Sequence, residues 1–284
     1  MKRDLMASFT SFVTVSIIFG LLIFPFFNQV MGSSTFPPPP SPQFSGRQPP
    51  VLQPELSATQ RSASTNQTCT LTPSLIKVEG TPQQIEGPYF VDGVPNRSDI
   101  RSDTSDSSVQ DGIPLRLILH VYDVDNNGSC TPLSNAKVDI WHANSQGTYS
   151  GVQDAGTGQN DFLRGYQMTD GKGTVQFTTI YPGWYEGRAI HIHVKVRNFE
   201  GSNETLEWTS QLYLNNSINE YIHTQPPYNK HGPVDMTNEE DFIYTGPSTD
   251  GLVKTNTGQH LMLKLNGNEQ QGYTGTFNIG VNAN

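Results

Sequence analysis

The feature that most constrains this 284-residue chain is a histidine pair inside a short run of alternating apolar residues. The run reads Ala189-Ile-His191-Ile-His193-Val-Lys-Val196. Alternation with a period of two is typical of a β-strand, in which residues i and i+2 point to the same face. His191 and His193 are therefore expected to face the same way. Imidazole pairs bind zinc, copper, iron or nickel, so the spacing indicates a metal site without naming the metal. The alternative is two ordinary core or surface histidines.

Short strand-like segments separated by turn clusters recur through the rest of the chain. They are expected at residues 115–124, 136–141, 174–180, 190–197, 208–214, 259–265 and 273–281. The chain also contains 26 glycines and 20 prolines, and it has few long segments with a helical period. This pattern predicts an all-β fold, a β-sandwich of mainly antiparallel strands. Residues 215–250 are expected to form a loop-rich stretch that covers one end of the sandwich.

The first 67 residues indicate export and a spacer. Lys2 and Arg3 precede an apolar stretch near residues 12–27, so residues 1–32 are expected to be a cleaved signal peptide or, alternatively, a membrane anchor. Residues 33–67 are rich in Pro, Ser and Gln and predict a disordered linker. Residues 68–284 then form the folded domain, secreted or held outside the cytoplasm. The N-terminal segment offers a means of tethering to a membrane or cell wall.

The cysteine count and the net charge narrow the class of protein further. Cys69 and Cys130 are the only cysteines, and in an exported chain they predict one disulfide. A shared metal site is the rival interpretation, although neither cysteine lies near the histidine pair in the sequence. The net charge is −9 and the pI is about 5.2, with no basic stripe to neutralise phosphates. Nucleic acid is therefore not an expected partner.

Two tyrosines in turn-like settings extend the candidate site. Tyr149 lies in Gly147-Thr-Tyr149-Ser-Gly151, and Tyr185 ends the segment Pro182-Gly-Trp-Tyr185. On the residues alone, each could be a packed aromatic with a hydrogen-bonded hydroxyl. A phenol has a pKa near 10, so keeping it ionised at pH 7 costs about 4 kcal/mol unless a cation offsets the charge. A hard trivalent ion such as Fe(III) would do so, whereas zinc more often binds thiolate, imidazole or carboxylate.

The ordered set of motifs from about residue 69 to 214 resembles the intradiol ring-cleavage dioxygenases, which include the catechol 1,2- and protocatechuate 3,4-dioxygenases. The resemblance is far more specific than any single motif. It is carried by Glu86-Gly-Pro-Tyr89, Asp139-Ile-Trp-His-Ala-Asn144, Gly147-Thr-Tyr149-Ser-Gly151, Phe162-Leu-Arg-Gly165, Thr169-Asp-Gly171, Thr179-Ile-Tyr-Pro-Gly-Trp-Tyr185, Arg188 and His191-Ile-His193.

The resemblance implies a non-haem Fe(III) cofactor and a role for each site residue. The implied metal ligands are two phenols and two imidazoles: Tyr149, Tyr185, His191 and His193. Tyr185 matches the ligand that leaves the iron when substrate arrives, and Arg188 matches the arginine that stabilises negative charge on the bound ring. Gln211 matches a pocket glutamine of the catechol-cleaving members, more weakly than the others.

The resemblance also implies the reaction, in which O2 opens a catechol-type ring between its two hydroxyl-bearing carbons and gives a dicarboxylate. Two phenolates and one hydroxide neutralise Fe(III). If hydroxide and one phenolate each take a proton from the catechol, the site stays neutral with substrate bound. The substituents on the ring and the oligomeric state are left open, because the proline-rich segment replaces the N-terminal helical dimerisation segment of catechol 1,2-dioxygenases.

Two other functions remain as alternatives: an exported sandwich that binds phenolics, and a copper- or zinc-binding sandwich. Several polar residues are expected to have no chemical role. Glu239-Glu-Asp241 is interpreted as a solvated acidic face, and Asp123–Gly128 as a turn between strands. His142 is expected to be structural, with a place behind the site as the alternative. The histidines expected to be ordinary surface or loop residues are His120, His223, His231 and His260.

Overall fold

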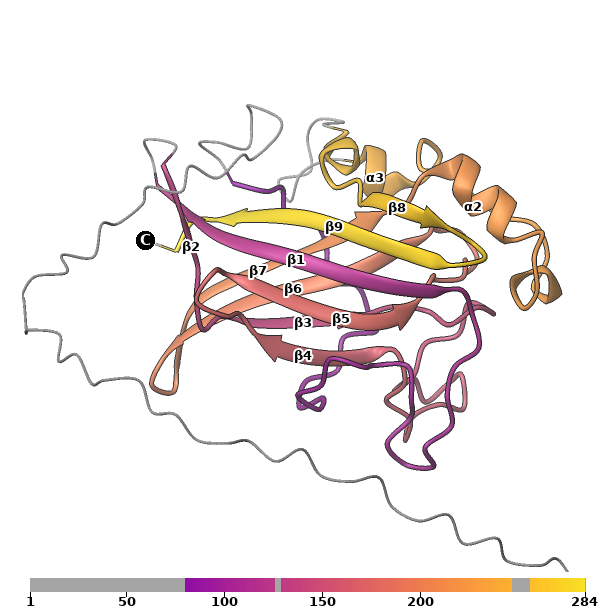
Figure 1. Ribbon diagram of the computed structural model, residues 1–284, viewed down its shortest axis with the longest axis horizontal. Coiled ribbons are helices and arrows are strands. Elements are labelled where there is room, and N and C mark those ends of the chain that lie inside the picture. The colour runs from indigo at the N-terminus through magenta and orange to yellow at the C-terminus, as the bar shows by residue number, and fades with distance from the viewer. Residues whose placement is uncertain (1–79, 126–128, 247–255, 284) are drawn as a thin grey trace, which may run out of the picture. The chain divides into compact units, whose positions relative to one another are not determined.

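The histidine pair lies on an inner strand of a four-stranded antiparallel sheet, which we call the histidine sheet (Figure 1). A computed structural model of the protein describes residues 80–125, 129–246 and 256–283. The order of strands in the histidine sheet is β4 (Arg164–Met168), β3 (Lys137–Trp141), β6 (His191–Glu200) and β7 (Asn203–Tyr213).

The second sheet, which we call the β1 sheet, is organised around one long strand. β1 pairs with β9 in parallel on one side, and with β5 and β2 in antiparallel fashion over successive stretches of its length. β8 then pairs with β9. The strands are β1 (Pro114–Val124), β2 (Cys130–Pro132), β5 (Thr174–Ile180), β8 (Lys264–Asn268) and β9 (Gly272–Val281). The predicted all-β sandwich is therefore confirmed.

Short helical segments connect the last strands of the two sheets. Figure 1 shows α2 and α3 beside β8, in the part of the chain predicted to be loop-rich. They are α2 (Asn216–Ile222), the 3-10 turn η1 (Tyr228–Lys230), α3 (Phe242–Thr245) and the 3-10 turn η2 (Thr257–His260). None of the helices among the described residues is long and apolar enough to cross a membrane.

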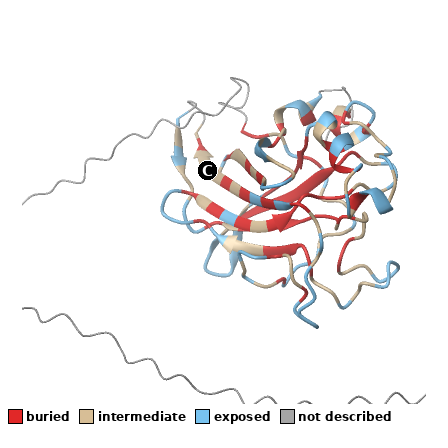
Figure 2. Cartoon of the chain, turned by 45° about the vertical axis from the view of Figure 1, so that its right-hand side comes forward, coloured by how far each residue is buried: buried red, intermediate tan, exposed pale blue. Residues whose placement is uncertain are grey.

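The alternation in β6 assigns its residues to two different environments. Ile192, Val194 and Val196 enter the core between the sheets, where they join residues such as Leu117 and Phe177 of the β1 sheet. The residues between them occupy the opposite face, and these are also almost fully buried: His191 at 3%, His193 at 1%, Lys195 at 5% and Arg197 at 6% exposure. Figure 2 shows the buried residues concentrated on the strands. β6 therefore carries four polar side chains on a face that is shielded from water.

A segment that we call the strap, residues 80–92, covers this polar face. Its backbone is fixed to β7 by a hydrogen bond from Gln84 N to Thr209 O at 3.0 Å. Lys195 Nζ donates to Glu86 Oε2 of the strap at 2.5 Å, and Arg197 pairs with Asp92 at 3.0 Å. Arg197 also pairs with the buried Asp139 of β3 at 2.9 Å. The strap thus supplies the partners that buried polar groups need.

Some strand boundaries differ from those predicted. β1, β5 and β9 agree with prediction within one residue, whereas β7 begins at residue 203 rather than 208. The added residues are largely exposed and form the hairpin with the end of β6, so no apolar pattern marks them. The prediction of a strand at 259–265 was wrong, because residues 257–260 form η2 and the strand begins at 264. The short strands β2 and β4 were missed because they carry few apolar residues.

Other predictions lie partly or wholly outside the described residues. These include the signal peptide or anchor at 1–32, the linker at 33–67 and Cys69 of the predicted disulfide. Within the predicted turn, Asp125 N donates to Ser129 O at 2.9 Å between β1 and β2. Its central residues 126–128 are likewise outside the described ranges.

Substituting Arg197 with methionine should be strongly destabilising. It would leave the buried Asp139 with only the more distant Lys137 Nζ, at 3.6 Å, as a cationic partner. We expect the free energy of unfolding to fall by about 3–5 kcal/mol, and a second change, Asp139→Asn, to restore much of it. Urea denaturation measures both effects.

The control is Arg101→Met, which breaks the ion pair with Asp99. The two side chains are 36% and 49% exposed, so the change should cost less than about 1 kcal/mol. Equal losses for Arg197→Met and Arg101→Met would show that burial does not set the cost of breaking these pairs.

Candidate metal centre

The two histidines of β6 converge on one point. His193 lies opposite Trp141 of β3 and Gln211 of β7, and its ring stacks on the Trp141 ring at 4.7 Å with 5° between the planes. His191 Nδ1 donates to the Ala189 carbonyl at 2.6 Å, which leaves the lone pair on its Nε2. The Nε2 atoms of the two histidines are 3.0 Å apart. The same-face prediction is therefore confirmed.

Both imidazoles are neutral at pH 7. Burial lowers the pKa of His191 to about 3, and the positive charge of Arg188 lowers it further. Burial likewise holds the pKa of His193 well below 6.5, with His191 and Arg188 as further causes. Two neutral ring nitrogens at 3.0 Å must share one proton between them or jointly face a cation. The arrangement is suited to the second role, because both Nε2 atoms are directed to the same place.

Glycines bring the two tyrosine loops together. Tyr149 lies in the loop that follows β3, and Tyr185 lies in the loop that follows β5. The Asn144 carbonyl of the first loop accepts hydrogen bonds from Gly147 N at 3.0 Å and from Gly183 N at 3.1 Å. A Cβ on Gly147 would come within 2.2 Å of the Trp184 oxygen, and one on Gly183 within 2.4 Å of the Asn144 oxygen. Only glycine permits this close approach.

The buried Arg164 fixes the Tyr149 loop against the strap. Its Nε donates to Ser150 Oγ at 2.8 Å and one terminal nitrogen donates to the Tyr89 carbonyl at 2.9 Å. The other terminal nitrogen donates to the Ser150 carbonyl. The Tyr89 ring in turn stacks on the Tyr149 ring, with centroids 4.6 Å apart. Tyr149 is thereby held in place through both its backbone and its ring.

The four rings form one cluster. The Tyr149 and Tyr185 centroids are 5.5 Å apart, Tyr185 and His191 are 5.7 Å apart, and Tyr149 and His193 are 6.1 Å apart. The Tyr149 hydroxyl is buried without a well-formed hydrogen bond. Burial raises the pKa of Tyr149 well above 10, and it also raises the pKa of Tyr185, although Arg188 opposes the second shift. Without a cation, both phenols therefore remain neutral.

The donor set fits a hard trivalent cation such as Fe(III). Two Nε2 atoms converge, and a buried phenol oxygen without a good partner of its own lies in the same cluster. In the described part of the chain, no group of three or more His, Cys, Asp or Glu side chains could hold a metal ion. Phenolates suit a cation of higher charge, whereas zinc more often binds thiolate, imidazole or carboxylate.

Arg188 and Gln211 complete the cluster. One terminal nitrogen of Arg188 lies 3.3 Å from Tyr185 Oη, and the other donates to Gln211 Oε1 at 2.5 Å. Gln211 Nε2 donates to the Ile85 carbonyl of the strap at 3.0 Å. The structure thus brings together all six residues singled out from the sequence. A cavity of about 150 Å³ opens beside them, lined by Tyr89, Gly147, Thr148, Tyr149, Val152, Ala155 and Tyr185.

The structure corrects the interpretation of Asp241 and part of that of His223. Asp241 is not part of a solvated face; its exposure is 0%, and it is the N-cap of α3. An Asp just before the apolar run Phe-Ile-Tyr is a capping signal that the sequence did contain. His223 lies in the turn after α2, as the loop interpretation expected, but it is not at the surface: its exposure is 3% and its Nδ1 donates to Asn219 O.

Tyr89 and His142 also take on clearer roles. Tyr89 belongs to one of the motifs that carry the resemblance but had no expected role of its own, although it stacks on Tyr149. His142 is buried, with Nδ1 bonded to the Ala143 carbonyl and Nε2 accepting from Thr179 Oγ1 at 2.7 Å. These contacts support the predicted structural role of His142.

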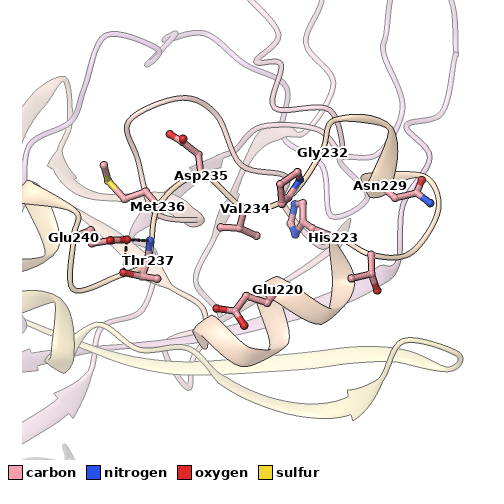
Figure 3. Close-up of a pocket in the computed structure, with 11 residues that line it drawn as sticks. Glu220, His223, Asn229, Gly232, Val234, Asp235, Met236, Thr237 and Glu240 are labelled. Atoms are coloured by element: carbon pink, nitrogen blue, oxygen red, sulfur yellow. Dashed lines mark hydrogen bonds between the residues drawn. The ribbon is translucent and has the colours of Figure 1, made fainter.

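A larger cavity of about 590 Å³ lies elsewhere, between the α2 side of the molecule and the segment that leads to α3 (Figure 3). Glu220 and His223 line it from the α2 side, and Val234 and Glu240 line it from the other. None of the clustered tyrosines and histidines belongs to its lining. The size of a cavity therefore does not identify the candidate metal centre.

Comparisons with known proteins agree with this geometry. A family model described as a dioxygenase matches residues 85–225, which include all six clustered residues. A solved structure of an intradiol ring-cleavage dioxygenase from Tetranychus urticae is 30% identical with a TM-score of 0.57, and the match covers 72% of this chain and 94% of that one. A second dioxygenase structure is 30% identical with a TM-score of 0.58, covering 72% and 95%.

Curated relatives match over a shorter stretch. Catechol 1,2-dioxygenase from Acinetobacter baylyi is 38% identical over 112 residues, which are 37% of this chain and 32% of that protein. Chlorocatechol 1,2-dioxygenase from Pseudomonas putida is 28% identical over 142 residues, or 40% and 47%. The chain thus spans from about a third to about half of these relatives' length.

Acid should destabilise the metal-free protein in part through His142. Burial lowers the pKa of His142 from 6.5 to about 4, so between these values the unfolded chain binds a proton that the folded chain does not. The contribution of neutral His142 to the free energy of unfolding is then complete above about pH 6.5 and is lost as the pH drops towards 4. In His142→Gln, the number of protons taken up on unfolding in this window should fall by about one. The slope of unfolding free energy against pH measures it; an unchanged slope would contradict the lowered pKa of His142.

Proposed function

The chain belongs to the intradiol ring-cleavage dioxygenase family, and we propose that it is a non-haem Fe(III)-dependent dioxygenase. Its substrates would be catechol-type rings, opened with O2 between the two hydroxyl-bearing carbons to give dicarboxylates. The observation that carries the proposal is the cluster of two phenol and two imidazole side chains beside Arg188. Its relatives' names as catechol and chlorocatechol dioxygenases support the substrate class.

Four atoms would hold the iron: Tyr149 Oη, Tyr185 Oη, His191 Nε2 and His193 Nε2. When bound, Fe(III) would supply the positive charge that keeps the two phenols ionised and the Lewis acidity that favours loss of the catechol protons. Ala189 keeps His191 Nε2 free of a proton by accepting from Nδ1. Trp141 fixes the orientation of the His193 ring by stacking on it.

The two tyrosines are suited to different tasks. Tyr149 is 4% exposed and is stacked against Tyr89, so its ring has little freedom to move. Tyr185 is less buried, and both tyrosines line the cavity of about 150 Å³. A catechol must lose two protons to bind as a dianion. Tyr185 Oη, once ionised by the cation, would be the base that takes one and moves aside, and a hydroxide would take the other. Tyr149 would remain in place, which limits the change in buried charge.

Arg188 supplies a fixed positive charge at the same place. Its terminal nitrogens point to Tyr185 Oη and Gln211 Oε1, and therefore towards the cluster. Negative charge that develops on the catechol ring as it reacts with O2 would be stabilised by this guanidinium. Gln211, anchored to the strap through Ile85, would fix the direction of the Arg188 side chain.

We further propose that the enzyme works outside the cytoplasm, secreted or tethered through its N-terminal segment. The support is the basic start, the apolar stretch and the Pro-rich spacer in residues 1–67. Cell fractionation of the expressed full chain, followed by N-terminal sequencing, would test this proposal, since an intact residue 1 in a soluble intracellular chain would contradict it.

Turnover of catechol by the iron-loaded protein tests the proposed function. We expect one O2 consumed per catechol and both atoms of ¹⁸O2 in the dicarboxylate product, detected by mass spectrometry. Tyr185→Phe should lower kcat by about 10²–10⁴-fold because the base is lost, and Arg188→Met by about 10²–10³-fold. Tyr273→Phe, at a buried tyrosine of β9 away from the cluster, is the control and should stay within about twofold. Absence of ring opening in the iron-loaded wild type would refute the proposal.

A further inference from the structure

One buried carboxylate joins Arg188 to the start of α3. Asp241 Oδ2 accepts from Arg188 Nε at 3.0 Å and from the Ala189 backbone N at 2.9 Å. Its Oδ1 accepts from Ile243 N at 2.7 Å and from Tyr244 N at 3.3 Å, which caps α3. Four donors thus share one side chain with 0% exposure.

These contacts determine where the guanidinium points. A guanidinium is planar, so fixing Nε and one terminal nitrogen fixes the whole group. Asp241 holds Nε, and Gln211 Oε1 accepts from one terminal nitrogen at 2.5 Å. The remaining terminal nitrogen then lies 3.3 Å from Tyr185 Oη. Asp241 is the acceptor that the described residues place at Nε, so its loss would remove this restraint on the guanidinium plane.

The pair is also balanced in charge. Arg188 has a side-chain exposure of 18%, and its ion pair with Asp241 compensates a cation that is largely removed from water. Among the described residues, Tyr185, Gln211 and Tyr213 also have side chains that interact with Arg188, and none of these is a carboxylate. Asp241 lies beyond residues 85–225, the stretch matched by the family model. The loop-rich part of the chain therefore contributes directly to the site.

We propose that Asp241 is a positioning residue that holds the Arg188 guanidinium in its catalytic orientation. This inference rests on the proposed function, and it adds a residue that acts through Arg188 without itself contacting the metal ligands' side chains. The effect is expected in kcat more than in KM, because Arg188 stabilises charge that develops only during the reaction.

Asp241→Asn is the informative variant. Asparagine is as good a helix N-cap as aspartate, so its oxygen can still cap α3, while the amide cannot supply an anion to Arg188. We expect kcat to fall by about 10–100-fold and KM to change by less than about threefold. Iron content per chain should be unchanged. Thr245→Val is the matched control, because Thr245 Oγ1 donates to the Asp241 backbone carbonyl at 2.9 Å and does not touch the carboxylate. Its kcat should stay within about twofold of wild type.

A double-mutant cycle separates positioning from general damage. If Asp241 acts through Arg188, then Asp241→Asn should lower kcat/KM by less than about threefold further in an Arg188→Lys background. Full multiplication of the two losses, or an equal loss in Thr245→Val, would overturn the proposal.

A measurement that does not depend on turnover tests the role of Asp241 separately from the proposed function. The Nε–H signal of Arg188 can be followed by NMR in ¹⁵N-arginine-labelled, metal-free protein and assigned by its absence from Arg188→Lys. We expect its hydrogen exchange to be at least about tenfold faster in Asp241→Asn than in wild type or Thr245→Val. If exchange is unchanged in Asp241→Asn, the positioning role is refuted even when wild-type turnover is confirmed. If catechol is not turned over, the proposed function fails, and the exchange rates still decide whether Asp241 holds the guanidinium.

Discussion

Everything at the candidate metal centre depends on one strand that is buried on both faces. In β6, alternate residues enter the sandwich core, and the residues between them, from His191 to Arg197, are polar and shielded from water. Buried polar groups require partners, and the chain provides them in two ways. Further along β6, carboxylates from the strap and β3 pair with Lys195 and Arg197. At the start of β6, the imidazoles of His191 and His193 face each other beside two phenols, and a cation would be the natural partner of these four groups.

The centre is arranged so that the protein itself contributes almost no net charge. The imidazoles are neutral, the phenols are neutral until a cation binds, and Arg188 is compensated by Asp241. A bound trivalent ion would then be neutralised by the two phenolates together with one hydroxide. The asymmetry between the immobilised Tyr149 and the more accessible Tyr185 provides for proton transfer at one ligand without loss of the other. The contact between Asp241 and Arg188 thus both orients the guanidinium and compensates its charge.

The sequence predicted the sandwich and the six-residue cluster well because both follow from local patterns. Alternation placed His191 and His193 on one face, and motif resemblance selected Tyr149, Tyr185 and Arg188. The sequence patterns could not show that Asp241 belongs to the site. This residue lies more than fifty positions after Arg188 and contacts it only through tertiary folding. The same limit applies to β4 and the start of β7, which carry no pattern of buried apolar side chains and pair because of their neighbours.

The visible and resonance Raman spectra of the iron-loaded protein test the central claim most directly. We expect one Fe(III) per chain and a tyrosinate-to-iron charge-transfer band, which weakens in both Tyr149→Phe and Tyr185→Phe. Anaerobic catechol should shift the band in the wild type, with loss of the Tyr185 contribution. A colourless protein, or a band unaffected by both substitutions, would contradict the claim that these side chains form one iron centre.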